Sequence, residues 1–165
     1  MPLNGMKNPI LLLLCSCIFA SCSNIQNEEE AKVLQEAFFS LLGNDRINEK
    51  LEKVELITST STHTYMAKGT SDSSLEKLRK CLKKTAVSGS NILVKDFGWN
   101  RKKVGTMILY SETAEVRYEI YRSLSKDSLF CITVPLVGDK GGASLYYFYN
   151  SEDKATNDNY CDLWK

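Results

Sequence analysis

The seven residues Val116-Arg-Tyr-Glu-Ile-Tyr-Arg122 decide the fold, because their side chains alternate in character. Val116, Tyr118 and Ile120 fall on one side of an extended chain, and the residues between them fall on the other. A period of two is typical of a β-strand that has one face against a core. The stretch therefore predicts a strand of an antiparallel sheet.

The same period continues on both sides of this stretch. Turn-forming residues separate the segments at Glu112-Thr113, at Lys126-Asp127 and at 138–142. Short turns between successive strands are typical of an antiparallel meander. The further strands that we expect are 104–110, 129–137 and 145–149, together with a short strand at 92–97.

Before the sheet, the apolar residues follow the period of a helix. Ala31, Leu34, Phe38 and Leu41 recur at spacings of three and four. They follow three glutamates, which suit the positive end of a helix dipole. The pattern predicts a first helix over 28–42.

Two more helices are expected before the sheet. A second helix is predicted over 45–56, with Asp45 as its cap and a narrower apolar stripe. The pattern Ser73-x-x-Glu76 has the form of a capping box and predicts a third helix, which ends at 88–90. Between these helices, the threonine-rich stretch 58–64 is expected to be a strand or a loop.

This order of elements predicts an α+β domain, with three N-terminal helices packed on a curved antiparallel sheet of four to five strands. Over about 28–149 the order resembles the NTF2-like fold. That resemblance implies a bent sheet that wraps around helices to form a cone with a pocket. A simpler sandwich, with the helices on one face of the sheet, is the alternative.

The N-terminus has the features of an export signal. An apolar run follows Lys7 and ends in small residues before Cys22, and it is too short to span a bilayer. The residues Phe-Ala-Ser-Cys at 19–22 resemble the lipobox of bacterial lipoproteins. The resemblance implies that Cys22 is acylated and becomes the new N-terminus. An ordinary cleaved signal peptide with a chance cysteine is the alternative.

These features divide the chain into a signal peptide with its lipobox (1–22), a tether (23–27) and a single domain (28–165). The tether holds the domain within roughly 20 Å of the membrane, at ~3.5 Å per residue. We therefore expect a lipid-anchored protein of the bacterial cell envelope. Ser23, which is not acidic, favours the outer membrane over the inner membrane.

Three of the six cysteines remain in the predicted mature domain, namely Cys81, Cys131 and Cys161. In an oxidising compartment we expect one disulfide and one free thiol, and the sequence leaves the pairing open. The cysteine spacings match no zinc motif, so no metal or other cofactor is expected. The aromatic ending at 160–164 is expected to dock on the domain.

Positive charge is concentrated between residues 77 and 103, although the net charge is only +1. The low net charge argues against a nucleic-acid partner. We expect the concentrated charge to form a face for an acidic partner or anionic lipid, with a solvated helix face as the alternative. The residues of this predicted face are Lys77, Arg79, Lys80, Lys83, Lys84, Arg101, Lys102 and Lys103.

The sequence contains no recognisable catalytic motif. His63 is the only histidine, and Asp72, Asp96 and Glu119 are the acids that could meet it in space. We therefore predict no catalytic residue. The expected function is a non-catalytic binding role for a protein partner or small ligand, and an immunity protein is one variant. The alternative is an NTF2-like cone that binds or converts a small ligand in a pocket containing His63.

Overall fold

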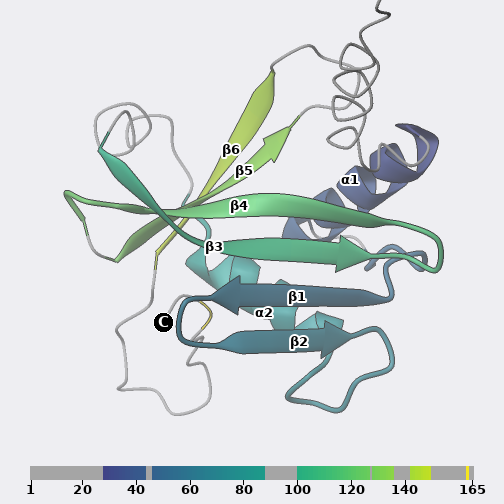
Figure 1. Cartoon of the computed structure of the whole chain (residues 1–165). Helices are drawn as coiled ribbons and strands as arrows, with labels where there is room; N and C mark the ends of the chain where they lie inside the picture. Colours follow the sequence, from purple (N-terminus) through teal and green to yellow (C-terminus); the bar gives the residue numbers. More distant parts are fainter. Residues whose placement is uncertain are drawn as a thin grey trace, which may run out of the picture.

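The alternating stretch forms β4 (Glu115–Ser123), which lies inside a six-stranded antiparallel sheet (Figure 1). This computed structural model describes residues 28–43, 46–87, 100–126, 128–135, 142–149 and 163. The strands follow the spatial order β2-β1-β3-β4-β5-β6, so most neighbours in the sheet are also neighbours in the chain. The other strands are β1 (Lys53–Thr58), β2 (Thr62–Met66), β3 (Arg101–Tyr110), β5 (Leu129–Pro135) and β6 (Ala143–Tyr149).

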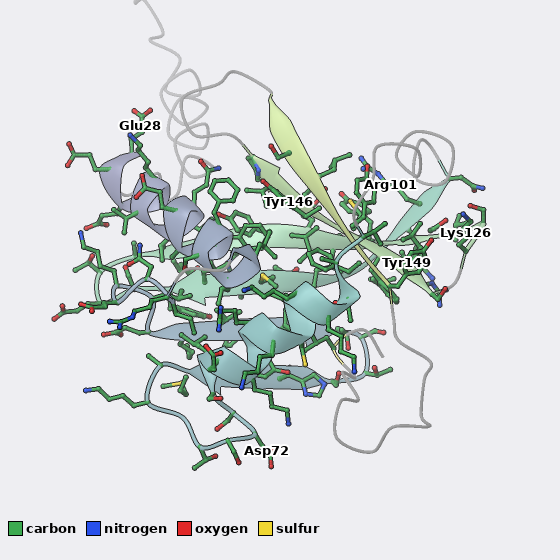
Figure 2. All side chains as sticks on the ribbon, turned by 180° about the vertical axis from the view of Figure 1, so that it is seen from behind. Glu28, Asp72, Arg101, Lys126, Tyr146 and Tyr149 are labelled. Carbon is green, nitrogen blue, oxygen red and sulfur yellow. The ribbon has the colours of Figure 1, made fainter. Side chains whose placement is uncertain are left out.

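Two helices, α1 (Glu28–Leu42) and α2 (Leu75–Thr85), cover one face of this sheet. Figure 1 shows both of them behind the sheet, and Figure 2, seen from behind, shows both in front of it. We call this side the helix-covered face and the other side the opposite face. Acidic residues occupy the first turn of α1, as expected for a helix N-terminus.

The core lies between the helices and the sheet. Phe38 of α1 is fully buried and meets Tyr118 and Tyr146 edge-on, with ring centroids 5.2 and 5.3 Å apart. Edge-on aromatic pairs of this kind are favoured by the ring quadrupoles. Leu163 belongs to the same cluster, so this residue of the predicted docking segment packs on the domain, while the rest of 160–164 lies outside the described residues.

The predicted set of three helices and four to five strands is wrong, because 45–56 does not form a helix. Ile47, Leu51 and Val54 have helical spacing, but Val54 and Leu56 are buried in β1 as alternate strand residues. Leu51 reaches the core from the irregular chain before that strand. The period of two in Lys53–Thr58, followed by the β2 hairpin, raises the sheet to six strands.

The element order on which the resemblance to the NTF2-like fold rested is also corrected, because the strands β1 and β2 lie between α1 and α2, where a second helix was expected. Both helices lie on one face of the sheet, as expected for the simpler sandwich (Figure 1). The four strands expected between 104 and 149 are confirmed as β3 to β6. The short strand expected at 92–97 lies outside the described residues. The third predicted helix is α2, but its cap is Ser74 and not Ser73.

Gly105 of β3 lies where the backbone of the neighbouring strand β1 leaves no room for a side chain. A Cβ at Gly105 would lie 2.4 Å from the Ile57 carbonyl oxygen of β1. The β3–β4 register shifts between Lys103 and Gly105, which is the mark of a β-bulge. A side chain at this position would therefore push β1 and β3 apart.

The hydroxyl of Tyr118 provides a test of the core. It is buried and has no hydrogen-bond partner among the described residues. An unpaired buried hydroxyl costs on the order of 1–3 kcal/mol. Tyr118→Phe is therefore expected to raise the free energy of unfolding by about 1 kcal/mol, measured by urea denaturation.

The matched control is Tyr110→Phe. The Tyr110 hydroxyl donates a 2.8 Å hydrogen bond to Oε2 of Glu55, so its removal should lower the free energy of unfolding by about 1 kcal/mol. If Tyr118→Phe destabilises the protein as much as this control does, the account of an unpaired hydroxyl is wrong.

Candidate functional site

Helix α2 has one apolar side and one basic side. Leu75, Leu78 and Leu82 are buried against the core, as the helical spacing predicts. Lys80 and Lys84 are exposed. Lysines in the last turn also suit the negative end of the helix dipole, so their presence has a structural reason as well.

The first turns of α2 hold the acids of this surface in ion pairs. Nζ of Lys77 lies 2.7 Å from Oδ1 of Asp72, in the loop before the helix. Nε of Arg79 donates a 2.8 Å hydrogen bond to Oε2 of Glu76, one turn earlier. From Leu78 to Thr85 the helix contains no acidic residue, so positive charge accumulates toward its C-terminal end.

The positive charge of α2 lowers the pKa of Glu76. The hydrogen bond from Arg79 lowers the pKa of the Glu76 carboxyl below its ordinary value, and the charges of Arg79, Lys80 and Lys83 lower it further. The same contact raises the pKa of the Arg79 guanidinium. The hydrogen bond from Lys77 similarly lowers the pKa of Asp72. All of these shifts favour the charged forms, so the surface is ionised at neutral pH.

The second half of the predicted basic face lies elsewhere. Arg101 stacks over the ring of Tyr121, with its guanidinium carbon 4.5 Å from the ring centroid. Nζ of Lys103 lies 2.6 Å from Oε1 of Glu119. Tyr121 and Glu119 alternate with the core residues of β4, so these contacts are on the opposite face of the sheet.

The structure therefore divides the eight predicted residues between two faces. Lys77, Arg79, Lys80, Lys83 and Lys84 belong to α2, whereas Arg101 and Lys103 are engaged across the sheet from it. Lys102 is exposed in β3 between these two residues. We restrict the candidate site to the last three lysines of α2, of which Lys80 and Lys84 are exposed and Lys83 is partly buried. We name Lys80, Lys83 and Lys84 the α2 lysine cluster.

A negatively charged hollow lies beside the start of α1. Its volume is about 530 Å³, and its described lining includes Lys50 and five glutamates. Figure 2 places Glu28 at one end of the molecule and Asp72, just before α2, at another. The acids in the first turn of α1 and the lysines in the last turn of α2 give the domain an uneven distribution of charge. The glutamates are Glu29, Glu30, Glu49, Glu52 and Glu112.

His63 does not meet the acids proposed for it. It pairs with Leu56 in the β1–β2 ladder and so projects toward the helix-covered face. Glu119 lies on the opposite face, and Asp72 is bonded to Lys77. Asp96 lies outside the described residues. Within the described part of the chain, no group of three His, Cys, Asp or Glu side chains is arranged to hold a metal ion.

Of the two cysteines within the described residues, only Cys131 is a free thiol. It is fully buried on the opposite face, packed with Leu129 and Tyr147. Burial raises the pKa of its thiol to about 11, so it carries almost no reactive thiolate at neutral pH. Cys81 is buried in the main core on the inner side of α2.

Sequence reasoning missed a second hollow, on the helix-covered face of the sheet. Its volume is about 220 Å³, and Arg122 contributes the charged group of its described lining. The period of two in β4 carries the inward series from Tyr118 and Ile120 to Arg122, so this signal could have identified the residue. The other lining residues are Thr58, Ser59, Thr60, Val104, Ile120 and Phe130.

Cys22, the predicted lipidation site, lies outside the described residues. Within the residues that the structure covers, no helix is both long enough and apolar enough to cross a bilayer. No family model, curated protein or solved structure matches this chain.

Proposed function

We propose that this chain is a lipid-anchored protein of the bacterial envelope with a non-catalytic binding role, in which the α2 lysine cluster contacts an acidic protein. The observation that supports this most is the lysine-rich outer side of α2, which has no acid after Glu76. Its apolar residues all serve the core, so the helix turns its lysines outward. Exposed charge of one sign attracts partners of the other sign and speeds their association.

The position of the acidic hollow favours an acidic protein over the membrane itself. The tether residues 23–27 directly precede Glu28, so the lipid anchor would join the domain beside the glutamates that line the hollow. Anionic headgroups would repel this end of the domain. The α2 lysine cluster is then better placed to meet a protein than the bilayer surface. An immunity protein, which neutralises a toxin by binding it in the envelope, would fit this chemistry.

The test is a charge reversal with a matched control. Lys80→Glu, Lys83→Glu and Lys84→Glu, combined in the lipidated protein, should weaken binding of the acidic partner captured from the envelope by about tenfold or more. The control combines Lys32→Glu, Lys50→Glu and Lys68→Glu, three exposed lysines outside α2 that give the same change in net charge. Partner recovery is measured by quantitative mass spectrometry at low and high salt.

The control should retain the partner, and binding by the wild-type protein should fall as salt rises. If both triple variants lost the partner equally, net charge alone would explain the loss of binding, and the proposal would be contradicted. Vesicles that contain or lack anionic phospholipid provide the membrane comparison. The proposal would also be contradicted if the α2 lysine cluster bound the vesicles in proportion to their anionic lipid content, with no protein partner present.

A further inference from the structure

Arg122 places a guanidinium in the hollow on the helix-covered face. It lies two residues after Ile120 in β4 and pairs with Phe130 of β5, and both of these neighbours belong to the core. Residues directly opposite one another in a ladder project to the same side. Arg122 is therefore directed toward the core side of the sheet and is only partly exposed.

One nitrogen of this guanidinium is buried without an acceptor. Within the described residues, Nε of Arg122 is buried without a hydrogen-bond partner. The other arginines of the strands have partners, since Arg117 lies 2.9 Å from Oε1 of Glu115 and Arg101 stacks over Tyr121. A buried charged donor without an acceptor has lost hydration without replacement. The arrangement favours any anion that can enter the hollow and pair with it.

The lining restricts the kind of anion. Arg122 is its one charged residue among those described, so a single negative charge is balanced. Val104, Ile120 and Phe130 provide apolar walls, and the β1–β2 turn provides hydroxyl groups at the rim. At about 220 Å³ the hollow is smaller than the sites that hold drug-sized ligands. The fork of a guanidinium matches the two oxygens of a carboxylate.

We infer that this hollow is a binding site for a small organic carboxylate with a short apolar body. The carboxylate pairs with the guanidinium of Arg122, and the apolar body rests against Ile120 and Phe130. The turn at Thr58 is held by its own hydrogen bonds, since the Thr58 hydroxyl accepts from the backbone N–H of Ser61 at 3.1 Å. The site is therefore largely formed before a ligand enters. It is separate from the α2 lysine cluster and does not depend on it.

The test is a titration of the full mature protein in detergent micelles, followed through the ¹H–¹⁵N signal of the Arg122 Nε–H. The probes are isobutyrate, its uncharged isostere isobutyramide, and inorganic phosphate, all at constant ionic strength. Isobutyrate should shift the signal in a saturable manner, with a dissociation constant of about 1 mM. Isobutyramide should cause no saturable shift, and phosphate should bind more weakly than isobutyrate.

Two variants accompany the titration. Arg122→Lys keeps the charge but loses the fork, and it should weaken isobutyrate binding about tenfold, followed through the amide signals of the 58–60 turn. Arg117→Lys, on the opposite face, should bind as the wild-type protein does. A wild-type signal that never saturates, or that responds more strongly to phosphate, would overturn the inference, even if Arg122→Lys failed to fold. Unchanged binding in a folded Arg122→Lys variant would overturn it as well.

Discussion

Replacing Cys22 with alanine is expected to move the protein from the membrane fraction to the soluble fraction of the envelope. Residues 19–22 resemble the lipobox of bacterial lipoproteins, and in that family the cysteine of the lipobox carries the acyl chains. Each buried CH₂ of such a chain contributes about 0.8 kcal/mol to membrane affinity, so the loss of several chains should abolish anchoring. Fractionation and detergent phase partitioning of whole envelopes measure the effect.

The control for this change is Cys17→Ala, in the apolar part of the predicted signal peptide. It removes a nearby cysteine without touching the lipobox cysteine, so the protein should remain in the membrane fraction. If Cys22→Ala stayed in the membrane as fully as this control, the lipid anchor would be refuted. The proposed placement of the acidic hollow next to the bilayer would then lose its basis.

The second large effect that we expect is a fall in the free energy of unfolding when a predicted disulfide is removed. We propose that Cys81 pairs with Cys161, because Cys131 is a free thiol and Leu163 is buried in the same cluster as Cys81. A bridge that closes a loop of this length stabilises a protein by roughly 4 kcal/mol, through the reduced entropy of its unfolded chain. Cys81→Ala and Cys161→Ala should each lower the free energy of unfolding by about this amount under oxidising conditions.

Cys131→Ala is the matched control, and it should cost only about 1 kcal/mol, from the small space it leaves in the packing. Thiol labelling gives an independent measurement. Cys131 should react only after unfolding, and Cys81 should react only after unfolding and reduction. A double variant of Cys81 and Cys161 that loses twice as much stability as either single variant would argue against their pairing.

The sheet was largely predictable from the sequence, because β4 and its neighbours show a clear period of two. The exception was β1, where two periods overlap. Ile47, Leu51 and Val54 have the spacing of a helix, while Val54 and Leu56 have the spacing of a strand. Pairing with both β2 and β3 decides between them, and this tertiary contribution is not visible in a local pattern.

The candidate site was predictable in part. Leu78 and Leu82 fix the inner side of α2, so the outward direction of Lys80 follows from the helical period alone. The direction of Lys103 does not follow in this way, because a bulge between Lys103 and Gly105 shifts the register of β3. The carboxylate site could not be predicted as a cavity, since its lining comes from several strands and a turn.

The central claim, that the α2 lysine cluster meets an acidic protein, is tested most directly by a photo-crosslinking residue at position 86 in living cells. Ala86 is exposed and is the C-cap of α2, two residues after Lys84. The control position is Thr64, which is exposed in β2 and pairs with Glu55 on the opposite face. We predict one discrete acidic protein crosslinked at position 86, absent at position 64 and lost in the α2 triple charge reversal. A crosslinked protein that persists in that variant, or crosslinking to lipid alone, would contradict the account.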